Sequence, residues 1–188
     1  MTPQQVNQVQ TSFTKIVPIA DKAAALFYGR LFEMAPETQA LFCGDMNRQG
    51  WKLMSALATV VKGLRDFEAI VPIVRDLARR HVAYGVQPEH YALVRSALLW
   101  TLEQGLGDEF TPALRAAWAA AYCALSEVMI ASAYPGVTAS LLTEPIMTQV
   151  QSGNGNQASK PFRRQSEPPG FADSNCPRVC KERDEHTI

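Results

Sequence analysis

The sequence predicts an all-α fold, and three observations support this prediction. Apolar residues recur every three or four positions from Val6 to about Met129, no stretch alternates apolar and polar residues as a strand does, and proline or glycine separates the periodic segments. Helical periodicity places the apolar residues of each segment on one face. We therefore expect six to eight helices that pack by these faces.

The N-terminal third predicts two helices and one short helical piece. The apolar stripe of the first helix consists of Val6, Val9, Phe13, Ile16 and Val17. Asp21 is a candidate N-cap of the second helix. The stripe of this second helix consists of Ala24, Tyr28, Leu31 and Phe32. Pro36 then begins a short piece that runs to Phe42.

The middle of the chain predicts a loop and two amphipathic helices. Polar residues and glycine from 43 to 49 indicate the loop. The stripe that follows consists of Gly50, Leu53, Met54, Leu57, Val60, Val61 and Leu64. The next helix, over residues 70–81, has its stop signal at Gly85. Its buried side is expected to consist of Ile70, Ile73, Val74, Leu77 and His81.

Two prolines mark the start of the last two helices. Pro88 takes a favoured first-turn position before a stripe of Tyr91, Val94, Leu98 and Leu102. Thr111 and Pro112 begin the last long helix, which ends at Pro135. Beyond it, glycine, serine, asparagine, glutamine and proline prevail and the apolar repeat stops. The chain thus predicts a helical domain over 1–135 and a disordered C-terminal tail over 136–188.

Composition argues against several classes of partner. The chain has 188 residues, is 47% hydrophobic and carries 18 basic and 18 acidic side chains, which suits one domain with its own core. It contains no long uncharged apolar run for a bilayer, and its N-terminus lacks the blocks of a signal peptide, so we expect a cytoplasmic protein. Balanced charge without a basic stripe argues against nucleic acid and membrane partners.

The four cysteines do not predict a disulfide framework. Two lie far apart in the helical part, and Cys176 and Cys180 lie near the C-terminus. A three-residue spacer without a following histidine matches neither a thioredoxin-type pair nor a c-type haem attachment. We interpret Cys176 and Cys180 as two solvated thiols.

Three polar residues are predicted to point inward. His81 ends an amphipathic helix on its buried side, where a histidine is either a core residue with a satisfied hydrogen bond or a metal ligand. Tyr28 lies on an apolar helix face, and Gln49 lies one turn before Leu53. Taken alone, Tyr28 is interpreted as a core aromatic and Gln49 as a solvated helix start. Periodicity does not choose between these interpretations.

Five segments together resemble the globin family over about residues 5–134. They are 26–32 (LFYGRLF), 36–42 (PETQALF), 80–86 (RHVAYGV), 88–91 (PEHY) and 107–118 (GDEFTPALRAAW). Their joint order and spacing are similar to those of single-domain bacterial globins, neuroglobin and the haem domain of flavohaemoglobins. The resemblance implies a globin fold packed around a non-covalent haem b.

The resemblance also implies a role for each candidate residue. His81 becomes the proximal iron ligand, and Tyr28 and Gln49 become the distal pair. A phenol and an amide in a dry pocket would hydrogen-bond the partial negative charge of bound oxygen. Lys52 and Arg80 become candidate partners of the haem propionates. The other candidate cofactor-binding residues are Phe42, Leu53, Val86, Tyr91, Val94 and Leu98.

The sequence departs from the family at two positions. Gln49 stands where vertebrate oxygen carriers and neuroglobin have a distal histidine, which disfavours a histidine-closed six-coordinate iron. Ala133 aligns with the acidic residue that completes a network with Tyr91 in flavohaemoglobins. Without that carboxylate, we expect weaker imidazolate character at His81.

Two functions from different classes follow from the resemblance. The first is a haem protein that reversibly binds O₂, takes NO and CO as further ligands, and converts nitric oxide to nitrate with electrons from an external donor or reductase. The residues after the domain are too few for a flavin and nicotinamide reductase, which needs well over ~100 residues. The alternative is a haem-based gas sensor or interaction protein that signals through the C-terminal tail. A haem-free bundle, and either a monomer or a homodimer, stay open.

Overall fold

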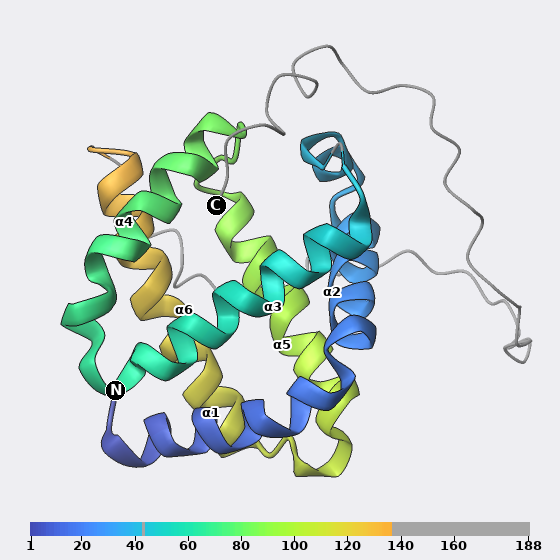
Figure 1. The fold of residues 1–188 in the computed structure, drawn as a ribbon, viewed down its shortest axis with the longest axis vertical. Coiled ribbons are helices and arrows are strands. Elements are labelled where there is room, and N and C mark those ends of the chain that lie inside the picture. The colour runs from blue at the N-terminus through green and yellow to red at the C-terminus, as the bar shows by residue number, and fades with distance from the viewer. Residues whose placement is uncertain (43, 137–188) are drawn as a thin grey trace, which may run out of the picture. The chain divides into compact units, whose positions relative to one another are not determined.

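The computed structural model describes residues 1–42 and 44–136. This part of the chain is all-α, as predicted, with six α-helices and four 3-10 helices (Figure 1). The α-helices are α1 (Pro3–Ile16), α2 (Ala20–Met34), α3 (Met46–Gly63), α4 (Phe67–Ala83), α5 (His90–Leu106) and α6 (Pro112–Ala133). The 3-10 helices are η1 (Val17–Ile19), η2 (Pro36–Leu41), η3 (Leu64–Asp66) and η4 (Gly107–Glu109). Apart from Gly136, the predicted tail lies outside the described residues.

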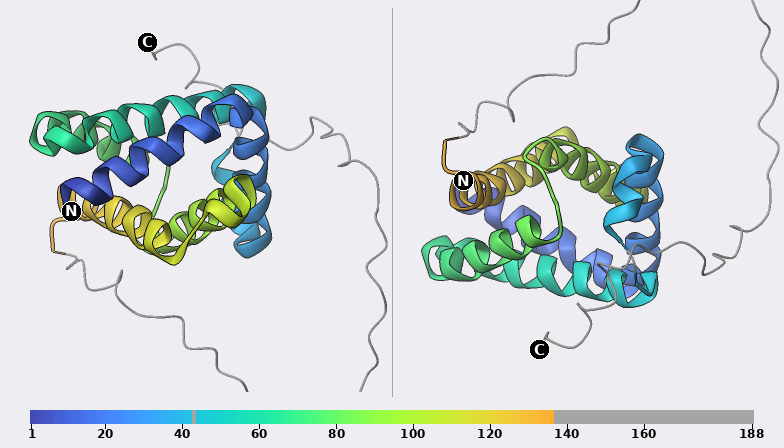
Figure 2. Two further views of the ribbon diagram at one scale, coloured as in Figure 1. Left: turned by 90° about the horizontal axis from the view of Figure 1, so that it is seen from below. Right: turned by 90° about the horizontal axis from the view of Figure 1, so that it is seen from above.

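The helices form two sides that meet at both ends. Figure 2 shows α3 and α4 following one another along one side, and α5 and α6 along the other. Helix α2 packs against both α3 and α5 at one end, and α4 packs against α6 at the other. Helix α1 packs against α3, α5 and α6. The two sides therefore carry the candidate residues of α3 and α4 opposite those of α5.

Helix α6 has the length and composition to cross a membrane, but its apolar side chains are used in the core. Of its 22 residues, eight are buried against neighbouring helices. Trp118 donates its indole N–H to Ser12 Oγ of α1 at 2.9 Å, in a buried position. Such a bond satisfies the one polar atom of a buried indole. These contacts are those of a core helix.

The predicted starts of α2 and α3 were wrong. Helix α3 begins at Met46 and not after Gln49, because the Asp45 carboxylate accepts a hydrogen bond from the backbone N–H of Asn47 at 2.8 Å and caps the helix. Asp21 caps nothing, because α2 follows η1 directly and the N-cap position is Ile19. Gln49 therefore lies inside the first turn of α3.

Two residues predicted to be buried are exposed. Val17 is 53% exposed in η1, where the chain has already left the stripe of α1. Ile73 is 55% exposed, because Ile70, Val74 and Ala78 fill the buried stripe of α4 at intervals of four residues. The buried stripe of α4 is therefore narrower than the apolar spacing predicted, and Ile73 lies outside it.

Helix α5 begins later than predicted, whereas α4 begins at Phe67, before the predicted start at Ile70, and ends at Ala83, after the predicted end at His81. Helix α5 begins at His90, two residues after Pro88. The Thr111 side chain caps α6 by accepting the backbone N–H of Leu114 at 3.3 Å. Gly85, just past the end of α4, has a φ of 84°, which a residue without Cβ adopts readily.

Gly63 provides a test of the contact between the end of α3 and the start of α4. A Cβ on Gly63 would lie 2.3 Å from Cγ2 of the buried Ile70. Gly63→Ala should therefore lower the free energy of unfolding by about 1–3 kcal/mol through overpacking. Urea unfolding measures this change.

Gly29 is the matched control for Gly63. It lies inside α2, and a Cβ there would meet nothing within 4 Å. Gly29→Ala should raise the free energy of unfolding by roughly 0.5–1 kcal/mol, because alanine loses less backbone entropy in a helix. Equal changes in the two variants would contradict the packing of Gly63 on Ile70.

Candidate functional site

Tyr28 of α2 lies in a cluster of aromatic rings. Its ring centroid is 5.1 Å from that of Phe27 and 5.2 Å from that of Phe42, both in edge-to-face geometry. Phe32 adds a tilted contact with the Tyr28 ring at 5.9 Å. The Tyr28 side chain is only 6% exposed. These contacts hold the ring and leave the hydroxyl as its polar end.

Tyr28 and Gln49, the predicted distal pair, lie together. Burial raises the pKa of Tyr28 to about 12, and a hydrogen bond with the Gln49 side chain acts in the opposite direction. The phenol is therefore neutral at physiological pH and keeps its O–H donor. The half-buried Gln49 amide adds N–H donors from the first turn of α3.

His81 lies in the last turn of α4, and one of its ring nitrogens forms a hydrogen bond. Its Nδ1 is 2.9 Å from the carbonyl oxygen of Leu77, one turn earlier. A carbonyl oxygen only accepts, so we assign the ring proton to Nδ1, which leaves the lone pair on Nε2. Burial lowers the pKa of His81, and the Leu77 hydrogen bond raises it by less. The ring is neutral at physiological pH, and Nε2 is available to a metal.

Tyr91 of α5 lies beside the His81 ring, and two further tyrosines, one on α6 and one just after it, hydrogen-bond to the backbone of Tyr91 and Val86. The Tyr91 ring lies 6.5 Å from the His81 ring with an interplanar angle of 27°. The Tyr122 hydroxyl donates to the backbone oxygen of Tyr91 at 2.8 Å, and the Tyr134 hydroxyl donates to that of Val86. Sequence reasoning did not assign Tyr122 or Tyr134 to the site. Their acceptors are backbone oxygens, which leave no pattern of residue types to detect.

The Tyr91 hydroxyl is buried without a hydrogen-bond partner within the described residues. Burial raises the pKa of Tyr91 to about 12, and the nearby Tyr134 hydroxyl raises it further. Ala133 packs against the same cluster of residues and offers no carboxylate. A buried unpaired hydroxyl costs about 1–3 kcal/mol, so this arrangement does not serve stability alone.

The apolar side chains that were predicted to contact the cofactor lie on several elements. They are Phe42, Leu53, Val86, Val94 and Leu98. Leu98 is buried, whereas the other four are half-buried. Val86 packs against the core cluster that contains Tyr91, and the others belong to or pack against the cluster that contains Tyr28. The site therefore has half-buried apolar side chains on both of its sides.

Lys52 lies on α3 and Arg80 on α4. Both side chains are exposed, and neither forms an ion pair with another described residue. Their role as propionate partners stays a prediction. The described residues also contain no group of three or more metal-ligating side chains. A metal at His81 would therefore need most of its ligands from a prosthetic group.

Comparison with known proteins identifies the family. Residues 25–129 match the family model for globins. The chain is 30% identical to a flavohemoprotein of Vibrio cholerae over 133 residues, which cover 69% of this chain and 34% of the relative. It is 36% identical to a flavohemoprotein of Bordetella parapertussis over 107 residues, 55% of this chain and 27% of the relative. The chain belongs to the globin family.

A solved structure has the same fold over most of the described residues. It is an engineered carbene transferase, a variant of a nitric oxide dioxygenase-like protein from Rhodothermus marinus. The two superpose with a TM-score of 0.65 at 29% identity, over 71% of this chain and 93% of that one. By contrast, this chain spans about a third of the length of the Vibrio cholerae relative.

The family implies a haem group, because globins pack their helices around a haem pocket. The residues present fit this group. One neutral histidine offers a free Nε2, a phenol and an amide lie together on a different helix pair, and apolar side chains lie half-buried on both sides. One protein ligand is also sufficient for a metal that a porphyrin already holds.

The buried tyrosines predict a loss of stability at high pH. The pKa of Tyr28 and of Tyr91 rises from an ordinary value near 10 to about 12 in the folded chain. The neutral form is thus favoured by folding, so the stabilisation is complete below pH 10 and disappears as pH rises from 10 to 12. Each tyrosine should lower the free energy of unfolding by roughly 1 kcal/mol per pH unit in that window.

Urea unfolding at pH 8, 10 and 11 measures this dependence. Tyr28→Phe should show a shallower decrease than the parent chain, because it removes one of the titrating groups. A variant that loses stability with pH as steeply as the parent chain does would contradict the assignment to Tyr28.

Proposed function

We propose that this chain is a haem b protein that reversibly binds O₂, with His81 as its proximal ligand and Tyr28 and Gln49 on the distal side. The observation that carries the proposal is the hydrogen bond between His81 Nδ1 and the Leu77 carbonyl. It determines the tautomer in which Nε2 can bind a metal. The globin family and the flavohemoprotein relatives support the same cofactor.

Each site residue has a separate role in ligand binding. Bound haem supplies an iron that holds a diatomic ligand and changes oxidation state. Tyr28 and Gln49 donate hydrogen bonds to a ligand that carries partial negative charge, and apolar surroundings strengthen these bonds. Phe42 and Leu53 exclude water from the distal side, and Tyr91 limits rotation of the His81 ring. Retention of O₂ and slow release follow from this arrangement.

An enzymatic extension is supported by the similarity to a nitric oxide dioxygenase-like protein. We propose that the chain converts nitric oxide to nitrate: one NO, one O₂ and one electron give one nitrate ion. The electron comes from a separate donor or reductase. Without a reductant, each haem would complete one turnover and stop, which is the behaviour of a scavenger. With a reductant, the chain acts as an enzyme.

We also propose residence in the cytoplasm. The most apolar helix, α6, uses its apolar side chains in the core and not at its outer surface. The flavohemoprotein relatives are themselves bacterial proteins. Both observations support the proposal, which is tested by fractionation of cells that express the full chain.

The absorption spectrum of the hemin-loaded full chain tests the haem site. Dithionite should give a high-spin five-coordinate ferrous spectrum that shifts sharply on addition of CO. His81→Gly should lose stoichiometric haem uptake and regain it with added imidazole, because imidazole replaces the missing ligand. His90→Gln is the control, since His90 Nδ1 already accepts the backbone N–H of Gln87 at 3.1 Å. No haem uptake by the parent chain, or a low-spin ferrous spectrum, would contradict the proposal.

The distal pair predicts an order of effects on O₂ release. Tyr28→Phe should speed release more than Gln49→Leu, because a phenol is a stronger hydrogen-bond donor than an amide. Loss of one such bond, worth roughly 1–2 kcal/mol, corresponds to about a five- to thirtyfold faster release. Stopped-flow displacement of O₂ by CO measures both rates. Equal rates, or the reverse order, would refute the ordering.

A further inference from the structure

The exposed apolar side chains of the described residues are concentrated on α3, α4 and the turn after α4. Six large apolar residues are exposed in the described part of the chain, and four of them are in these elements: Trp51, Ile73, Val82 and Tyr84. Trp51 is 70% exposed, the most of the six. Tryptophan and arginine are the residue types most enriched where proteins bind one another. These exposed apolar side chains thus mark a candidate surface for binding another protein.

The same part of the chain carries a net positive charge, whereas the other described residues carry a net negative charge. Residues 46–84 contain seven basic and three acidic side chains, a net charge of +4. These are Arg48, Lys52, Lys62, Arg65, Arg75, Arg79 and Arg80 against Asp66, Glu68 and Asp76. The other described residues contain five basic and nine acidic side chains, a net charge of −4. Net neutrality therefore conceals a strong separation of charge.

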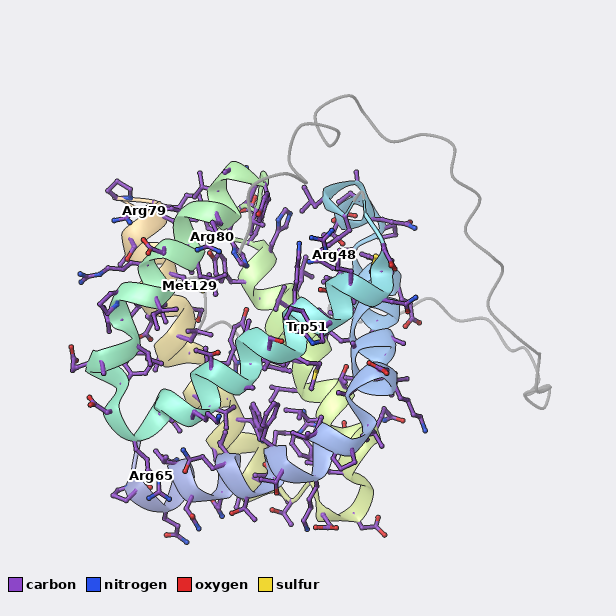
Figure 3. All side chains as sticks on the ribbon, in the orientation of Figure 1. Arg48, Trp51, Arg65, Arg79, Arg80 and Met129 are labelled. Carbon is purple, nitrogen blue, oxygen red and sulfur yellow. The ribbon has the colours of Figure 1, made fainter. Side chains whose placement is uncertain are left out.

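Three of the basic residues and the exposed tryptophan define what we call the basic–aromatic face: Arg48, Lys52, Arg80 and Trp51. Trp51 and Lys52 follow Arg48 by three and four positions on α3, so both are neighbours of Arg48 on the surface of that helix. Figure 3 labels Arg48 and Trp51 on α3 and Arg80 on α4, the two helices that share one side in Figure 2. All four are exposed, and the three cations form no ion pair with other described residues.

We propose that the basic–aromatic face is the docking surface for an acidic electron-donor protein. The inference rests on the proposed function, since it supplies the electron that nitric oxide dioxygenation requires. Gln49 and His81 lie on the same two helices and next in sequence to Arg48 and Arg80. A partner docked on this face therefore approaches the candidate haem site.

Charge selects this occupant over a second copy of the chain. Two copies meeting by this face would oppose two segments of net charge +4, which like-charge repulsion disfavours. An acidic partner would be attracted by the same charges and oriented by them before contact. Trp51 then supplies an exposed apolar contact, with Arg48 before it and Lys52 after it in sequence.

Direct binding tests the surface independently of catalysis. The probe is an acidic plant-type [2Fe–2S] ferredoxin, titrated calorimetrically into the hemin-loaded full chain. Binding should weaken at least tenfold between about 10 mM and about 300 mM salt, because shorter screening lengths suppress the attraction. Arg48→Glu and Trp51→Ala should each weaken binding about tenfold at low salt. Lys22→Glu, an exposed cation of α2 outside the face, is the control with the same change in charge and should have less than a twofold effect.

Electron transfer provides the second readout. Each reduced [2Fe–2S] cluster loses one electron and a ferric haem gains it, with NADPH and ferredoxin reductase to renew the donor. Arg48→Glu should slow this reduction about tenfold at low salt. It should leave reduction by dithionite and the CO spectrum unchanged, because neither requires docking.

The outcomes separate the two proposals. A parent chain that takes up no haem, or gives no CO spectrum with dithionite, would overturn the proposed function. A normal CO spectrum with salt-independent or absent ferredoxin binding, or with equal effects of Arg48→Glu and Lys22→Glu, would overturn the docking surface alone. Binding of phosphatidylglycerol vesicles that Arg48→Glu abolishes, without ferredoxin binding, would overturn it in favour of an anionic lipid surface.

Discussion

The hydrogen bond from His81 Nδ1 to the Leu77 carbonyl is the constraint on which the candidate site depends. It joins residues four positions apart, so α4 itself determines which ring nitrogen carries the proton. The helix is held in turn by its buried stripe, Ile70, Val74 and Ala78, and by its packing on α6. A change that tilted α4 would therefore alter the direction of Nε2 even if every pocket residue stayed in place.

The tyrosines around the candidate site divide into two kinds, according to their hydrogen-bond partners. Tyr122 and Tyr134 donate to backbone oxygens and thereby join helices and turns. Tyr28 interacts with a side chain, Gln49, and Tyr91 has no partner within the described residues. A hydroxyl with a backbone acceptor is satisfied by the fold, whereas a hydroxyl without one is free to serve a ligand or its neighbour. The two candidate site tyrosines are of the second kind.

The sequence was sufficient for the fold class and for the inward residues, but not for their edges or partners. Spacing identified Tyr28 and His81, because periodicity reports which face of a helix is buried. It misplaced Ile73, because periodicity does not report how wide the buried stripe is. It started α3 too late, since the cap depends on the Asp45 side chain and not on apolar spacing. The acceptors of Tyr122 and Tyr134 are backbone atoms brought close only by folding.

Net charge was the least informative quantity taken from the sequence. A balanced total led to the expectation that the chain has no electrostatic footprint for nucleic acid or a membrane, yet residues 46–84 carry a net charge of +4 and the other described residues a net charge of −4. The cations are spread along two helices and interrupted by acidic and apolar residues, so they form no continuous stripe for a phosphate backbone. A dispersed positive field around one exposed tryptophan suits a protein partner that binds briefly and leaves. Transient binding is also what repeated single-electron delivery requires, because a donor that stayed bound could not be renewed.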